Sequence, residues 1–104
     1  MTAAETFESI AEDYQADRRI TRATMLGAPG LKVNGKVFAS FYKNRLVLKL
    51  PNAQVDALSK AGKGEHFDPG MGRKMKEWVS LEDTKTWRRL TAEALEFVVT
   101  GGKR

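Results

Sequence analysis

The 104-residue chain contains no cysteine and only one histidine, His66. Without cysteine it can form no disulfide framework, and it offers neither a thiolate nucleophile nor a zinc-finger ligand set. It also lacks a long hydrophobic run: Lys49 interrupts the apolar stretch 46–48, far short of the roughly 20 apolar residues of a membrane helix. Five acidic side chains in the first seventeen residues are unlike the basic flank of a signal peptide. We therefore expect a cytoplasmic protein with no membrane segment and no cofactor.

Acidic residues are absent between Asp17 and Asp56, a segment that carries eight basic residues in a chain of net charge +5. A basic region of this kind can bind phosphates without reading base sequence. The same lysines can instead keep strand edges from pairing between molecules. We favour this second interpretation because aromatic residues are not clearly interleaved with the basic ones. If the segment does bind nucleic acid, the predicted contact residues are Arg22, Lys32, Lys36, Lys43, Arg45 and Lys49.

Hydrophobic periodicity predicts three helices. Apolar residues recur at helical spacing from Phe7 to Tyr14, and Thr2 with Glu5 has the spacing of a capping box. Gly62 lies where a helix C-terminal glycine belongs. The predicted helices cover about residues 2–17, 52–61 and 81–99, with Asn52 capping the second and Ser80 and Asp83 capping the third.

Runs of apolar and β-branched residues between turn signals predict an antiparallel sheet. The strands are expected at residues 20–26, 31–33, 36–42, 45–50 and 74–81, with a turn at 27–30. Asn34-Gly35 is typical of a two-residue type I′ turn and would place Val33 opposite Lys36. The element order α-β-β-β-β-α-β-α therefore predicts a single α+β domain over residues 1–104, a two-layer structure with helices packed on an antiparallel sheet.

Strict alternation along the hairpins assigns side chains to two faces. Val37, Ala39 and Phe41 would share the core face with apolar residues of the following strand. The second face would then carry Leu31, Val33, Phe38, Tyr42 and Val47. An apolar face of this size marks an interaction surface, represented by Phe38 and Tyr42, unless the last helix covers it. We favour cover by that helix, and a homodimer is the close alternative.

The glycine-rich segment 62–73 is the place where a catalytic or metal site would be expected, because it contains Glu65, His66 and Asp68. However, no second histidine exists, and the segment lacks the Gly-Lys-Ser/Thr ending of a phosphate-binding loop. The serines also lack a glycine-flanked nucleophile elbow. We predict no enzyme activity, no catalytic residue, no cofactor-binding residue and no metal ligand.

Three segments, residues 25–39, 46–51 and 67–79, follow one another in a pattern that resembles the N-terminal domain of the TfoX/Sxy family and, more distantly, the MmcQ/YjbR-like proteins. The resemblance spans about residues 7–99. It implies a two-layer α+β fold on an antiparallel sheet and an association with bacterial regulators of natural competence. It implies no catalytic residues.

Two functions from different classes remain. The one we favour is a small non-enzymatic interaction or regulatory module that acts through protein contacts with an unknown partner. The alternative is a nucleic-acid-binding domain that uses the basic hairpin region 18–49.

Overall fold

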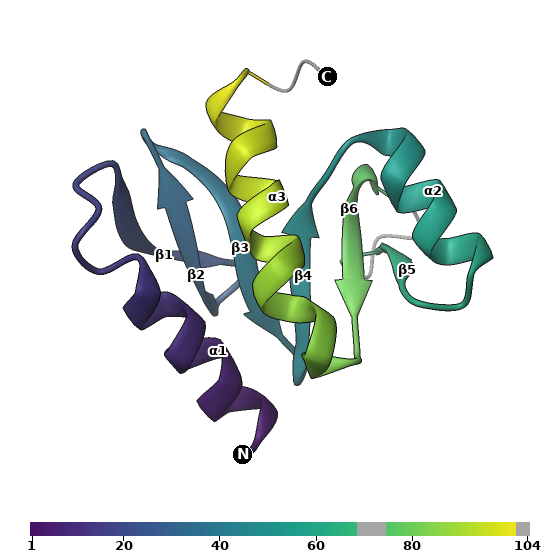
Figure 1. The fold of residues 1–104 in the computed structure, drawn as a ribbon, viewed down its shortest axis with the longest axis horizontal. Coiled ribbons are helices and arrows are strands. Elements are labelled where there is room, and N and C mark those ends of the chain that lie inside the picture. Colours follow the sequence, from purple (N-terminus) through teal and green to yellow (C-terminus); the bar gives the residue numbers. More distant parts are fainter. Residues whose placement is uncertain (69–74, 102–104) are drawn as a thin grey trace.

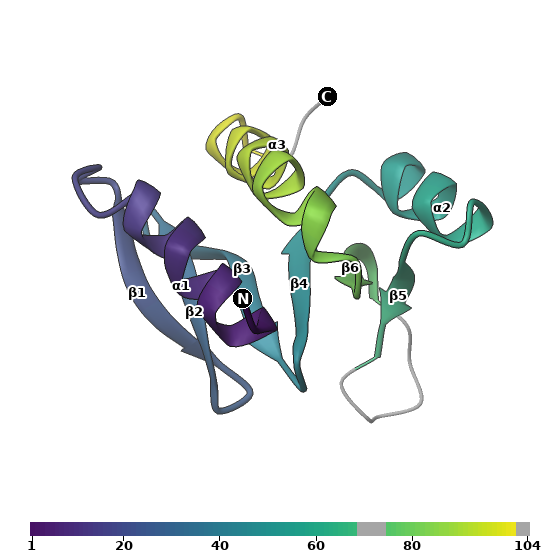
Figure 2. The same cartoon turned by 60° about the horizontal axis from the view of Figure 1, so that its bottom comes forward.

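The computed structural model describes residues 1–68 and 75–101 of the chain. It confirms the predicted α+β class: six strands form one antiparallel sheet in the order β1-β2-β3-β4-β6-β5, and helices α1, α2 and α3 lie on one face of it (Figure 1, Figure 2). The elements are α1 Ala3–Asp13, β1 Ile20–Met25, β2 Ala28–Val33, β3 Lys36–Tyr42, β4 Arg45–Lys49, α2 Asn52–Lys60, β5 Glu65–Phe67, β6 Met75–Leu81, a 3₁₀ turn Thr84–Thr86 and α3 Trp87–Val99.

The helix boundaries follow from their caps. The predicted capping box is confirmed, since the Thr2 side chain accepts from the Glu5 backbone N–H and the Glu5 carboxylate accepts from the Thr2 N–H. The predicted start of the last helix is wrong by six residues. Ser80 belongs to β6 and caps nothing, whereas Asp83 accepts from the Lys85 N–H and caps the 3₁₀ turn that precedes α3. Pro51, not Asn52, is the cap residue of α2.

Tight turns join the first four strands. The turn at 34–35 was predicted, and a similar turn at 43–44 joins the strands predicted at 36–42 and 45–50. All four turn residues have positive φ, as a type I′ turn requires. Val33 pairs with Lys36, which confirms the predicted register. A third turn of this kind lies at 26–27, so the predicted turn at 27–30 is too long, and the chain enters β2 at once. Gly30 belongs to β2, where an added Cβ would lie only 2.6 Å from the backbone oxygen of Ala39.

A bulge in β3 overturns part of the predicted assignment of side chains to faces. Ala39 and Phe41 face the core as predicted, but Val37, also predicted there, pairs with Lys32 and is only half-buried. Leu31 pairs with Ala39 and Lys32 pairs with Val37, so Phe38 is the extra residue on its strand. The bulge turns Phe38 toward the helices, where it is fully buried and meets Tyr14 edge to face. The prediction that Phe38 forms an interaction surface is therefore wrong. Leu31 and Val33, also assigned to the second face, likewise belong to the helix-side core.

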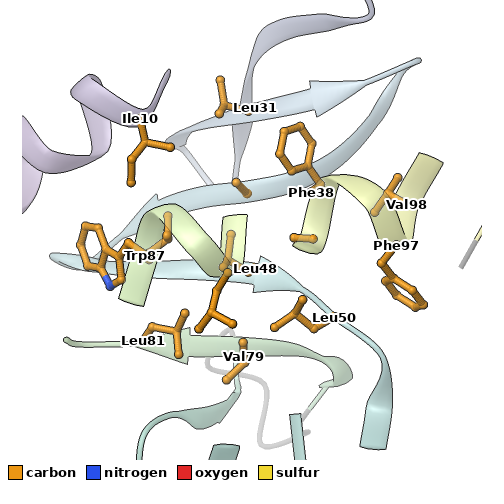
Figure 3. Packing of buried hydrophobic residues seen from close by; sticks show 14 of the residues in the cluster. Ile10, Leu31, Phe38, Leu48, Leu50, Val79, Leu81, Trp87, Phe97 and Val98 are labelled. Carbon is orange, nitrogen blue, oxygen red and sulfur yellow. The ribbon is translucent and has the colours of Figure 1, made fainter. Parts of the chain in front are cut away.

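The hydrophobic core lies between the sheet and the helices (Figure 3). Helix α3 contributes Trp87 and Leu90, both almost completely buried. The stacked rings of Phe7 and Phe41 lie 5.6 Å apart and join α1 to β3. Val55 anchors α2, which packs on β5 and β6. All three helices thus bury their apolar residues against the same face of the sheet.

The opposite face of the sheet carries no helix from residues 1–68 or 75–101, and we call it the helix-free face (Figure 2). The prediction that the last helix covers this face is wrong, since α3 lies on the core side with α1. Alternation from the paired core residues places Tyr42 and Val47 on the helix-free face, as predicted.

Strand β5 occupies part of the segment 62–73 that was predicted as a glycine-rich loop. Residues 69–73 of that segment lie outside the described residues. Lys74, predicted as the first residue of the last strand, also lies outside them. Among the helices of the described ranges, none has the length and apolar character needed to span a bilayer.

Candidate functional site

Charge is divided between the two layers of the domain. Within the described strands there are six basic and two acidic residues, a net charge of +4. Helices α1 to α3 carry seven acidic and three basic residues, a net charge of −4. The sheet is therefore the electropositive layer, and an approaching polyanion is attracted to the side that the helices leave open.

The strand register shows which basic residues face the helix-free side. Lys32 lies next to core residue Leu31, and Lys49 lies next to core residue Leu48, so both side chains point away from the helices. Arg45 lies an even number of positions from Lys49 along β4, so its side chain points to the same face. Lys43, in the adjoining turn, places its Nζ 5.3 Å from the centre of the Tyr42 ring. Four of the six predicted basic residues are thus on or beside one face.

The other two predicted contact residues do not belong to this face. Arg22 pairs with Leu31 in the sheet and lies on the helix side, where its Nη1 and Nη2 donate to the Glu8 carboxylate at 3.2 and 2.9 Å. These hydrogen bonds lower the pKa of Glu8. Lys36 pairs directly with the core residue Val33, so its side chain also lies on the helix side. Proximity in the sequence therefore predicted two contact residues that do not share the helix-free face.

Arg45 is largely engaged by its neighbours. Its Nε donates to the Ser80 Oγ at 2.9 Å and its Nη1 to the Glu82 carboxylate at 3.1 Å. The Glu65 carboxylate lies 4.0 Å from Nη2. A phosphate would have to compete with these partners, so Lys32, Lys43 and Lys49 are the stronger candidates for phosphate contacts.

Two partly exposed aromatic rings accompany these lysines. Trp78 pairs with Lys49 across β6 and β4, and the Lys49 Nζ lies 5.7 Å from the centre of the Trp78 ring. Tyr42 is matched in the same way with Lys43. Each ring therefore presents a π face to a cation at a distance typical of cation–π contacts. Sequence analysis missed Trp78 because it lies about thirty residues beyond the basic segment, and only the β4–β6 pairing brings them together.

A third aromatic residue, Phe67 on the edge strand β5, also lies on the helix-free face. Its ring meets the Tyr42 ring edge to face, with centroids 5.5 Å apart, although β4 and β6 separate their strands. The register places Val47 and Ser80 between them. The two rings thus lean over small residues, and Val47 is fully buried without a helix above it.

His66 lies on the other side of β5 and takes part in a structural contact. Its Nε2 is 2.8 Å from the Asp56 carboxylate of α2, which joins that helix to the sheet edge. Over residues 1–68 and 75–101, no three metal-ligating side chains gather at one place. The predicted absence of a catalytic centre stays a prediction.

Two hollows also carry charged groups, and the first of them borders the helix-free face at Arg45. One, of about 610 Å³, is lined by Arg45 and Lys63 but also by Glu65, Glu82 and Asp83. The other, of about 420 Å³, lies between α1 and β1, and its lining includes Glu8 and Glu12 with Arg22, whose guanidinium is paired with Glu8. The carboxylates at both places repel phosphate.

These observations define a small α+β domain with an open, basic and aromatic sheet face. No known family model matches the chain, and no curated protein or solved structure matches it either. The resemblance to the TfoX/Sxy family stays a prediction.

Proposed function

We propose that this chain is a non-enzymatic binding domain that binds nucleic acid through the helix-free face. The observation that carries the proposal is that Lys32, Lys43 and Lys49 lie on or beside this one face. The layer that carries them has a net charge of +4 over its strands, against −4 on the helices. Nucleic acid is the polyanion that such a face suits best, because Tyr42 and Trp78 stand beside the cations.

The expected affinity is that of a general phosphate binder. Each phosphate neutralised contributes roughly −0.7 to −0.9 to the slope of log K against log salt. Contacts by Lys32, Lys43 and Lys49 therefore predict a slope of about −2 to −3. Binding should be measurable at low salt and should weaken steeply as salt is added.

Fluorescence anisotropy of a labelled 20-nucleotide DNA, measured over a salt series, tests the proposal. Changing all three lysines to glutamine should flatten the salt dependence and abolish most binding. The matched control replaces Lys60, Lys85 and Arg89 with glutamine, which removes the same charge from the helical side of the chain. Affinity of this control should stay within about threefold of the wild type. Equal losses in the two triple variants, or no binding at low salt, would contradict the proposal.

A second candidate, a regulatory module that acts through protein contacts, is favoured by the free edge of the sheet. Strand β1 is the first strand in the sheet order and pairs with β2 alone. Such an edge can add a strand from a partner or from a second copy. The role implied by the TfoX/Sxy resemblance belongs to this candidate.

Sedimentation equilibrium at micromolar concentration tests the second-copy form of this candidate. Edge pairing predicts a dimer that Thr24→Pro, which removes a backbone donor from β1, converts to a monomer. A wild-type monomer excludes a stable homodimer.

A further inference from the structure

We infer that the nucleic acid bound by the helix-free face is single-stranded, and that its bases stack on the rings of Trp78 and Tyr42. This inference rests on the proposed function and narrows it to one class of ligand. The two residues lie beside opposite ends of β4, because Tyr42 pairs with Arg45 and Trp78 pairs with Lys49. A bound strand that reaches both rings therefore runs along β4.

The rings on this face differ from the other large aromatic residues of the domain. Trp87 and Phe38 are fully buried, and they serve the core. Trp78 and Tyr42 are only partly buried, and each holds a lysine ammonium near its ring. Tyr42 also meets the Phe67 ring edge to face. Such a ring can exchange the ammonium for the flat face of a base.

The lysines are suited to take part in this exchange. Lys43 and Lys49 have flexible four-carbon stems that let the ammonium swing from the ring to a nearby phosphate. The ring then receives the base of the same strand. One pair of residues thus supplies both parts of single-strand recognition, a stacking platform and a phosphate contact.

A duplex cannot use these rings in the same way. Its bases are already stacked inside the helix, so a sheet face meets the phosphate backbone and the groove edges. Duplex binding would therefore depend on the lysines alone. Stacking is worth about tenfold or more in affinity for each base, which predicts a clear preference for the single strand.

The test compares a 15-nucleotide single-stranded thymidylate with a 15-base-pair adenine–thymine duplex at the same low salt. Anisotropy measures binding, and tryptophan emission reports stacking. The chain has two tryptophans, and only Trp78 is accessible, since Trp87 is fully buried. We expect the single strand to bind at least tenfold more tightly than the duplex and to quench the emission of Trp78.

Variants at the two rings separate stacking from charge. Trp78→Leu and Tyr42→Leu should each lower single-strand affinity about tenfold, while duplex affinity and the salt slope change little. Trp78→Phe keeps a ring and should stay within about threefold of the wild type. Circular dichroism melting checks that each variant is folded.

The outcomes distinguish the inference from the function on which it rests. If neither nucleic acid binds, the proposed function fails, and the inference fails with it. If the duplex binds as tightly as the single strand and Trp78 emission does not change, the inference is overturned while nucleic-acid binding stands. Equal affinity of the Trp78→Leu variant and the wild type for the single strand would also overturn it.

Discussion

Replacing Phe38 with alanine tests the bulge in β3 directly. The side chain is fully buried against the helices and contacts Tyr14, so its removal leaves a cavity in the core. Buried phenylalanine-to-alanine changes cost about 3–5 kcal/mol. A domain of 104 residues has a total free energy of unfolding of about 5–15 kcal/mol. We therefore expect Phe38→Ala to remove about a fifth or more of the free energy of unfolding, and in the marginal case to unfold the protein.

Urea unfolding followed by circular dichroism measures this loss as a shift of the midpoint at constant slope. Val37→Ala is the matched comparison, because Val37 is the neighbour that strict alternation would place in the core, and it is only half-buried. It should cost about 1 kcal/mol or less. Phe38→Leu, which keeps most of the volume, gives a measurable value if the alanine variant does not fold. A larger loss for Val37→Ala than for either Phe38 variant would refute the bulge and restore the alternating register.

Two further predictions concern polar groups. Thr91 is fully buried, and its hydroxyl has no hydrogen-bond partner within the described part of the chain. Thr91→Val should therefore raise the free energy of unfolding by about 1 kcal/mol. If calorimetry shows a lower stability instead, the hydroxyl is hydrogen-bonded. Hydrogen bonds from Arg22 lower the pKa of Glu8 below its ordinary value of 4.5. The ion pair therefore stabilises the fold above that pH, and this stabilisation is lost as the pH falls and Glu8 is protonated. The melting temperatures of the wild type and of Glu8→Gln should differ at pH 7 and converge near pH 2.

Local signals in the sequence were sufficient to predict the Asn34-Gly35 turn and the start of helix α1. Asn34-Gly35 tolerates positive φ angles and therefore predicts its own turn, whatever the rest of the fold does. The capping box of α1 is equally local, because it joins Thr2 to a residue three positions away. Such features were predictable because the residues that form them are neighbours along the chain.

The bulge at Phe38 was not predictable in the same way. It is a property of how β2 pairs with β3, and the alternation of β3 alone is compatible with an unbroken register. The energetic reason for the bulge is visible only in three dimensions. The bulge lets Phe38, Leu31 and Val33 all face the core on the helix side. The unbroken register predicted from alternation would leave these side chains on the face without helices.

The candidate site was predictable only in its charge. The basic segment was identified by the absence of acidic residues over 18–55, but which of its cations share a face depends on strand parity. Arg22 and Lys36 lie near the others in sequence and face the helix side. Trp78 lies far away in sequence and faces the lysines, because β6 joins the sheet beside β4.

The one-sided arrangement of the helices also separates binding from stability. Trp78 and Lys49 lie outside the hydrophobic core cluster, so their substitution can change ligand affinity while the free energy of unfolding changes little. Tyr42 is different, because its contact with Phe67 covers Val47. A leucine at position 42 must therefore be checked for stability as well as for binding. This makes Trp78 the cleaner position at which to test whether the helix-free face binds bases.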